Sequence, residues 1–160
     1  MSKTPLVDVA QLRQHWERFS ALPGGKALFS KALGLMAPYT ATIDARIEEM
    51  RPGFARAHLV DRRKVRNHLH SVHAIALANL AELTGNLALI AAMPPDARMI
   101  ITGLSIAYLK KARGKITAVA ESPIPKSSER QEYEVQIRLE NPAREVIATA
   151  KLKSLLGPKE

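Results

Sequence analysis

The sequence predicts an α+β protein in which a curved, mostly antiparallel sheet wraps around one long central helix. Residues 72–92 are almost entirely Ala, Leu and Ile, the pattern of a helix that is apolar on all sides and therefore buried. Segments before and after this helix alternate apolar and polar residues with a period of two, as half-buried strands do. A sheet curled around the helix would leave one helix face open, and this open face predicts a dimer.

Two short helices are expected at the N-terminal end, over residues 1–38. The first begins after Asp8, a residue type that caps helices, and ends at Pro23-Gly24-Gly25. The second covers residues 26–36 and ends before Pro38. The apolar stripe that predicts the first helix consists of Val9, Leu12, Trp16 and Phe19.

Alternation predicts six strands, so residues 39–156 form the sheet and the central helix of one domain, residues 1–160. The first two strands are joined by the turn Arg51-Pro52-Gly53 as an antiparallel hairpin. The polar stretch 61–71 has no period and is expected to be a loop. The six strands are expected over residues 39–48, 54–60, 98–109, 115–121, 130–140 and 144–155.

Composition excludes several classes of protein. The sequence contains no cysteine, which excludes a disulfide scaffold, a thiol nucleophile, a zinc ribbon and an iron–sulfur site. The net charge of +9 attracts anions such as cofactor phosphates, nucleic acid or a membrane surface. Aromatic residues make up only 4% and the basic residues are spread widely, so we expect no nucleic-acid binding. Residues 1–5 lack an apolar core, so we expect no signal peptide and a cytoplasmic protein.

Glu82 is the strongest single indication of chemistry. It is the only charged residue in the run 72–92, and Asn79 and Asn86 lie on the same helix face at spacings of three and four. Burying an unpaired carboxylate costs free energy, so a carboxylate at this place is a candidate acid, base or nucleophile. Two structural alternatives stay open at this point. Glu82 either lies on a solvated stripe of the helix or pairs with an arginine.

The apolar run is also about long enough to span a membrane. However, a carboxylate at its middle would cost about 2.5–3.5 kcal/mol on insertion scales. The amphipathic strands on both sides favour a core helix, so we expect no membrane span.

The loop before the helix adds histidines and basic residues. We expect Ser71 to cap the helix, whose unpaired N–H groups attract negative charge. His68, His70 and His73 match no metal-binding spacing, so we expect loop or capping roles and no metal site. Two basic runs, residues 62–66 and 110–115, form either a solvated surface or a phosphate clamp.

The segment from this loop to Glu82 resembles a known motif. Residues 67–82, NHLHSVHAIALANLAE, are similar to the core motif of hotdog-fold acyl-CoA thioesterases of the phenylacetate-pathway type. That motif runs from an Asn or Gln, through His-Gly-Gly at the helix start, to an Asp or Glu on the helix. The interval from Asn67 to Glu82 and the place of His73 both fit. The two N-terminal helices resemble those of a hotdog subgroup that consists mainly of uncharacterised proteins.

The resemblance implies hydrolysis of an acyl-CoA thioester at a site shared across a homodimer, which can pair further into a tetramer. It implies that Glu82 is the nucleophile or general base, that the Ala74 N–H forms the oxyanion site, and that Asn67 orients water or the carbonyl. It implies no cofactor, since the coenzyme A thioester is the substrate, and it leaves open an acyl carrier protein as the acyl carrier. The implied substrate-binding residues are His73, Ile75, Asn79 and Asn86, with Lys110, Lys111 and Arg113 at the coenzyme A phosphates.

The sequence departs from this motif at the helix start. Ala74 and Ile75 stand where the family has two glycines. Glycine allows a backbone to approach a ligand closely, and the Ile75 side chain narrows that approach. The alternative function is therefore a non-catalytic protein of the same fold that binds an acyl group or acyl-CoA.

Overall fold

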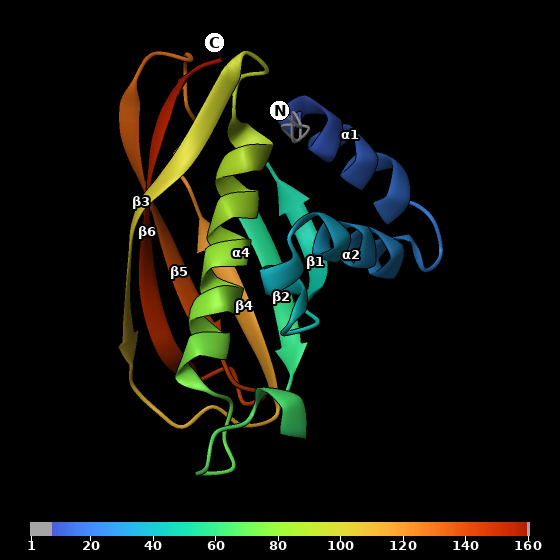
Figure 1. The fold of residues 1–160 in the computed structure, drawn as a ribbon, viewed down its shortest axis with the longest axis vertical. Coiled ribbons are helices and arrows are strands. Elements are labelled where there is room, and N and C mark those ends of the chain that lie inside the picture. The colour runs from blue at the N-terminus through green and yellow to red at the C-terminus, as the bar shows by residue number, and fades with distance from the viewer. Residues whose placement is uncertain (1–7, 160) are drawn as a thin grey trace, which may run out of the picture.

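The computed structural model describes residues 8–159, except for the side chains of residues 9 and 10. One sheet of six strands, all paired antiparallel, has the order β1-β2-β4-β5-β6-β3 and curves around the long helix α4 (Figure 1). This confirms the predicted architecture. The strands are β1 (Arg46–Arg51), β2 (Phe54–Val60), β3 (Ala97–Tyr108), β4 (Lys115–Glu121), β5 (Gln131–Glu140) and β6 (Val146–Pro158). The helices are α1 (Val9–Ser20), α2 (Gly25–Met36), α3 (Pro38–Ala41) and α4 (Ala74–Ala92), with a 3₁₀ turn at Arg63–Val65.

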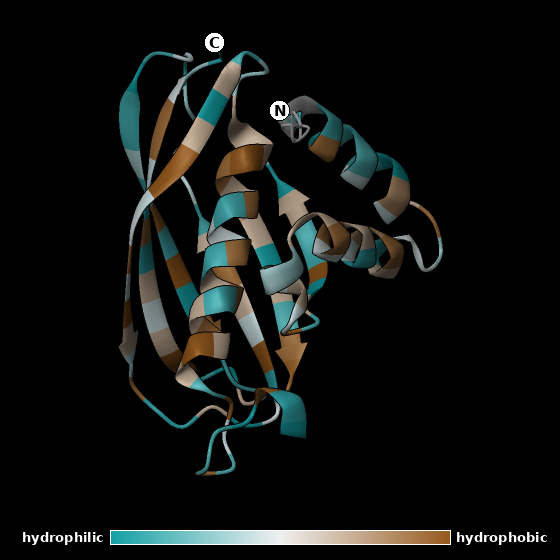
Figure 2. Ribbon diagram, viewed as in Figure 1, coloured by the Kyte–Doolittle hydropathy of each residue, from teal (hydrophilic) through white to brown (hydrophobic). Residues whose placement is uncertain are grey.

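Helix α4 is the core helix of the fold. Leu80, Leu87 and Leu89 are at most 1% exposed, and Figure 2 shows hydrophobic residues along the whole helix. Gly85 lets the helix approach the sheet, because a Cβ there would lie 2.9 Å from Cδ2 of Leu152. The helix is long and apolar enough to cross a membrane, but 61% of its apolar window is buried inside the protein. It is therefore a buried core helix, as expected.

The N-terminal helices α1 and α2 pack on the β1 side of the molecule (Figure 1). Leu12 and Trp16 are buried, and the Trp16 ring meets the Phe29 ring edge-on at 5.2 Å between centroids. These contacts confirm the predicted stripe at Leu12, Trp16 and the partly buried Phe19. The Val9 side chain and residues 1–7, on which the expectation about a signal peptide rests, lie outside the described residues.

The prediction of a strand over residues 39–48 is wrong in its first half. Pro38 begins the short helix α3, since its fixed φ suits the first position of a helix. Tyr39 is 69% exposed, so its alternation with the following residues does not mark a buried face. Asp44 then takes a left-handed φ of 49°, and β1 begins only at Arg46. The ends of the other strands differ from the predicted bounds by at most three residues.

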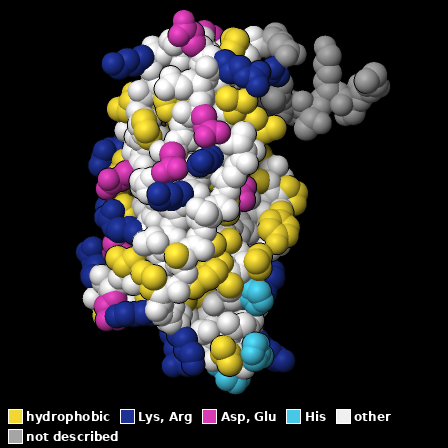
Figure 3. All heavy atoms as spheres, turned by 90° about the vertical axis from the view of Figure 1, so that its left-hand side faces the viewer, with side chains coloured by type: hydrophobic (Ala, Val, Ile, Leu, Met, Phe, Trp, Pro, Cys, Tyr) yellow, Lys and Arg dark blue, Asp and Glu magenta, His cyan; other side chains and the backbone are white. Residues whose placement is uncertain are grey.

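One face of α4 and one edge of the sheet have no cover among the described residues. In Figure 1 this helix face looks toward the viewer between β3 and α2. Strand β3 pairs only with β6, and Ile100, Leu104 and Tyr108 on it are 66%, 37% and 46% exposed. Figure 3 views this side and shows hydrophobic side chains among the charged ones. A long edge strand with exposed apolar residues is a template for pairing with another chain.

Candidate functional site at the start and open face of α4

Asn67 shapes the loop that leads into α4. Its Oδ1 accepts hydrogen bonds from the Leu69 N–H at 2.9 Å and from both the N–H and the Oγ of Ser71, at 3.3 and 3.2 Å. Its own N–H donates to the Ser71 carbonyl at 2.9 Å, and within this closed loop His70 holds a φ of 54°. The Asn67 oxygen is thus occupied. Its Nδ2 has no partner in the part of the chain that the structure describes, so Nδ2 is the atom left to bind a ligand.

His73 caps α4, and the prediction that Ser71 does so is wrong. The Nδ1 of His73 accepts from the Ile75 N–H at 3.0 Å, whereas Ser71 is buried and its hydroxyl donates to Asn67. The N–H of Ala74, the first residue of the helix, has no acceptor within residues 8–159. The Tyr108 hydroxyl donates to the Ala74 carbonyl at 2.9 Å, which fixes this first turn against β3. The helix start therefore offers an open donor at the Ala74 N–H.

Glu82 lies two turns further along, on the open face of α4. Its side chain is half-buried and has no hydrogen bond or ion pair with any other described residue. The arginine pair that the sequence left open is absent among the described residues, whereas the half-buried position of Glu82 on the open face is compatible with the solvated stripe. Eight residues at 1.5 Å each separate Ala74 from Glu82 by about 12 Å along the helix. Within one chain, these two groups cannot contact the same carbonyl.

The two asparagines on this face have different surroundings. The Asn79 Nδ2 donates to the Tyr39 carbonyl at 3.3 Å, and Asn79 is only 7% exposed, so it ties α4 to α3. The Oδ1 of Asn86 is buried but accepts no hydrogen bond from the described residues. A buried acceptor without a donor costs free energy. Asn86 thus has an unused acceptor one turn beyond Glu82.

A cavity of about 230 Å³ at the start of α4 brings several predicted residues together. His73, Ile75 and Asn79 line it, together with Tyr39, and Glu82 does not. Tyr39 gave no functional signal in the sequence, because it was assigned to a strand and its contact with Asn79 spans 40 residues of chain. The lining also includes Lys64 and Arg66 from the first basic run.

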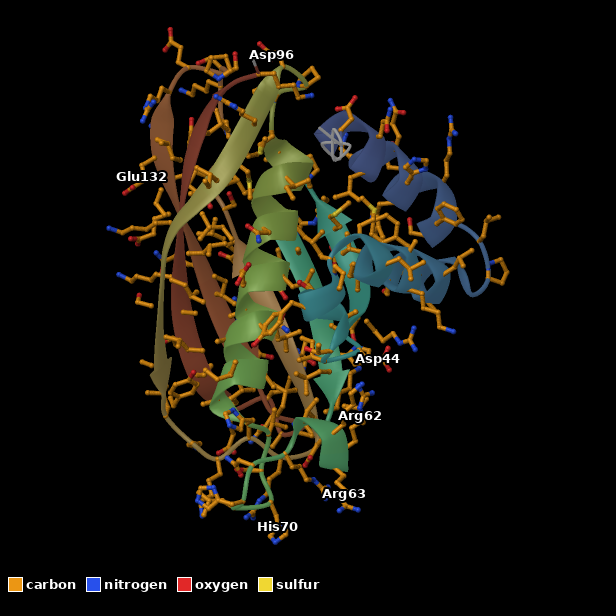
Figure 4. The ribbon with its side chains drawn as sticks, viewed as in Figure 1. Asp44, Arg62, Arg63, His70, Asp96 and Glu132 are labelled. Carbon is orange, nitrogen blue, oxygen red and sulfur yellow. The ribbon has the colours of Figure 1, made fainter. Side chains whose placement is uncertain are left out.

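The two basic runs lie side by side at the end of the molecule where α4 begins. The Val72 N–H donates to the Ala112 carbonyl at 2.8 Å, and the Asp61 carboxylate accepts from Arg66 at 2.6 Å and from the Gly114 N–H at 3.1 Å. Burial acts to raise the pKa of Asp61, but Arg66 and the Gly114 N–H outweigh it, and the pKa lies below its ordinary value. Figure 4 shows Arg62, Arg63 and His70 at this same end.

Several cations in these two runs are free to meet an anion. Lys110 pairs with Glu145 at 2.7 Å, which helps to lower the pKa of that carboxyl, and Arg62 pairs with Asp44 at 2.9 Å. Of the predicted phosphate-binding residues, Lys110 is therefore engaged. Among the described residues, Arg63, Lys64, Lys111 and Arg113 form no direct ion pair.

His68 and His70 are exposed at this end, where the described residues include no group of three or more His, Asp or Glu arranged to hold a metal ion.

Comparisons with known proteins agree with this architecture. Residues 25–156 match the family described as "Domain of unknown function (DUF4442)". The solved structure of APC5556 is 30% identical, covers 94% of this chain and 99% of that chain, and superposes with a TM-score of 0.80. PA5026 from Pseudomonas aeruginosa, described as a "Protein of Unknown Function" and "Probable Thioesterase", is 22% identical over 86% of this chain and 97% of that chain, with a TM-score of 0.75. Thioesterase HI1161 from Haemophilus influenzae is 15% identical over 80% and 90% of the two chains, with a TM-score of 0.67. No curated protein matches the sequence.

Proposed function

The chain belongs to the DUF4442 family and has the hotdog fold, and on this basis we propose that it hydrolyses acyl-CoA thioesters at a site shared between two copies of the chain. Its solved neighbours of the same fold include proteins described as thioesterases. The observation that carries the proposal is a half-buried, unpartnered Glu82 on the open face of an otherwise buried helix.

The separation of Ala74 and Glu82 supports a shared site. Ala78 lies midway between them in the same row of residues four apart, and it is half-buried on the open side of α4. If two α4 helices cross antiparallel at Ala78, Ala74 of one copy lies opposite Glu82 of the other. The small side chain at Ala78 permits close approach of the two helices. The unpaired edge of β3 with its exposed Ile100 supplies a second surface for the same dimer.

The chemistry follows from this arrangement. The thioester carbonyl accepts the Ala74 N–H, and the helix N-terminus stabilises the negative charge that develops on its oxygen. Glu82 of the other copy either attacks the carbonyl carbon or removes a proton from the water that attacks it. If Glu82 attacks, the carbon–sulfur bond breaks, the thiolate leaves and takes a proton from water, and a water molecule then hydrolyses the anhydride on Glu82 to release the acid. If Glu82 acts as the base, the activated water adds to the carbonyl, the carbon–sulfur bond breaks, and the proton held by Glu82 passes to the leaving thiolate. The Asn67 Nδ2 is available to orient the carbonyl or the water.

The basic end of the molecule fits the nucleotide part of coenzyme A. Lys111 and Arg113 lie beside the start of α4 through the bond between Val72 and Ala112, and neither is neutralised by a direct ion pair in the described region. Arg63 lies at the same end of the molecule (Figure 4), and Lys64 lines the cavity at the start of α4. Phosphate groups bound there would place the pantetheine arm toward the Ala74 N–H.

The test is release of free thiol from a panel of acyl-CoA esters by the wild type and by Glu82→Gln. The wild type is expected to hydrolyse at least one ester, and a folded Glu82→Gln variant is expected to lose most of that activity. Mixing Glu82→Gln with Ala74→Pro, which lacks the N–H, tests the shared site. In a mixed dimer, one site combines the intact Ala74 N–H of the first variant with the intact Glu82 of the second. Random mixing makes half of the dimers mixed, so about a quarter of the wild-type sites are restored. No recovery in the mixture would place both groups in one subunit and contradict the shared site.

Ile75 favours a second candidate function, a non-catalytic acyl-CoA binding protein. Its side chain is 54% exposed at the second position where the related motif has glycine. Binding of acyl-CoA measured by calorimetry, without thiol release from any ester, would support this alternative over hydrolysis.

A further inference from the structure

A larger cavity, of about 360 Å³, lies between α2, α3, the start of β1 and α4. Aliphatic and small residues form most of its wall, among them Leu33, Gly34, Ala41, Ala45, Ile47 and Leu83. Its volume lies in the range of about 300–1,000 Å³ that small-molecule sites occupy. The motif from Asn67 to Glu82 does not include any residue of this wall.

Two features shape this cavity. Its wall contains the small residues Gly34, Ala41 and Ala45, and Gly34 lets α2 approach α3 closely, because an added Cβ would lie 3.1 Å from the Ala41 Cβ. Hydrogen bonds fix the positions of the surrounding elements: the Ser30 hydroxyl donates to the Lys26 carbonyl and accepts the Ile47 N–H at 3.0 Å, which fixes α2 to β1. The bond from Asn79 to the Tyr39 carbonyl fixes α3 to α4. The cavity is therefore a built feature of the fold.

The position of the cavity relates it to the proposed chemistry. Leu83, in its wall, directly follows Glu82 on α4, so the cavity lies against the turn of the helix that carries Glu82, although the Glu82 side chain does not line it. In the proposed shared site, the basic surface comes from the other copy, whose Ala74 lies opposite this Glu82. A thioester whose carbonyl is at Glu82 thus has a charged surface on one side and an aliphatic cavity on the other.

We propose that this cavity binds the acyl chain of the substrate and selects aliphatic chains of medium length. A water-sized group takes about 30 Å³, so the cavity holds a chain of about ten carbons with little room to spare. The identity of the ligand as an acyl chain rests on the proposed thioesterase function. The presence of a site for an aliphatic chain rests on the cavity alone.

The experiment compares Ala41→Leu, which fills the cavity from α3, with the control Ala32→Leu, which adds the same side chain at an exposed position of α2 outside the wall. The measured quantity is kcat/KM for butyryl-, octanoyl-, decanoyl- and hexadecanoyl-CoA. The wild type is expected to prefer decanoyl-CoA. In Ala41→Leu, kcat/KM for decanoyl-CoA is expected to fall at least about tenfold relative to butyryl-CoA, since each methylene in a pocket is worth about tenfold or more.

A second readout separates this inference from the function itself. Binding of decanoate is measured by calorimetry on the wild type, on Ala41→Leu and on Ala45→Leu, which fills the cavity from a different segment. If no ester is hydrolysed but decanoate binds and both variants weaken it, the cavity assignment stands and hydrolysis fails. The opposite outcome is that esters are hydrolysed, both variants melt at the temperature of the wild type, and neither variant changes the chain-length profile. In that case the cavity assignment is overturned and hydrolysis stands.

Discussion

Replacing Ala74 with proline removes one hydrogen-bond donor from the proposed site with little effect on the fold. Ala74 is the first residue of α4, where proline is favoured and where the N–H has no partner inside the helix. His73 has φ −62° and ψ 140°, the extended region that a residue before proline prefers. The Ala74 carbonyl, which accepts the Tyr108 hydroxyl, is unchanged. We therefore expect the free energy of unfolding to change by no more than about 0.5 kcal/mol.

The catalytic effect of the same substitution should be large. Loss of one oxyanion donor costs about 10²–10³ in kcat, or about 2.7–4 kcal/mol of transition-state stabilisation. The Ile75 N–H cannot replace the lost donor, because it donates to the His73 Nδ1 at 3.0 Å. The KM should change much less than kcat, because the developing negative charge exists only in the transition state.

The assay follows thiol release from decanoyl-CoA, with kcat and KM measured separately and with thermal melting as the test of folding. Ala74→Gly is the matched control, because it also changes the side chain but keeps the N–H. It should retain kcat within a few-fold of the wild type. A folded Ala74→Pro variant with wild-type kcat would refute the assignment of the Ala74 N–H as the oxyanion donor.

Four further predictions follow from other parts of the structure. Ile75→Gly should raise kcat/KM for acyl-CoA by up to about tenfold in the same assay, since it removes an exposed side chain beside the proposed donor. The double variant Lys111→Ala/Arg113→Ala should raise KM in low salt and leave kcat unchanged, and added salt should abolish the difference from wild type. Leu80→Ala, at a side chain with 0% exposure, should lower the free energy of unfolding in urea by about 2–5 kcal/mol. Burial and the nearby Lys115 lower the pKa of His58 from 6.5, so the folded state favours the neutral ring. His58 thus contributes stability that is present above pH 6.5 and is lost as the pH falls through the lowered pKa. In His58→Gln, the urea midpoint of unfolding should therefore vary less with pH in that window.

The features that the sequence predicted well are those that local patterns determine. The composition of residues 72–92 was enough to identify α4, because a helix that is apolar on all sides has to be buried. The turn at Arg51-Pro52-Gly53 identified the hairpin, and Gly53 does take a left-handed φ of 77° there. Local alternation failed at residues 39–45, where Tyr39 and Ala41 are exposed and Ile43 is buried without being part of a strand.

The candidate site was predictable only in part, because contacts that are distant in sequence complete it. The motif from Asn67 to Glu82 located the loop and the helix. No pattern indicated that the Tyr108 hydroxyl would reach the Ala74 carbonyl across 34 residues, or that Asn79 would hold α3. The cap was mistaken for a different reason, because the contacts that decide it are local. Both Ser71 and His73 have suitable side chains, and the hydrogen bonds of Asn67 decide between them.

The replacement of the two motif glycines has unequal consequences for catalysis. At position 74, alanine keeps the N–H, and its methyl group does not compete for that donor. At position 75, the N–H is already used by the His73 Nδ1, so a glycine there would add no donor to the site. What isoleucine changes is access, because its side chain is 54% exposed in the wall of the cavity at the helix start. The departure from the motif therefore affects which thioesters can reach the Ala74 N–H more than it affects the stabilisation of negative charge once a carbonyl is bound there.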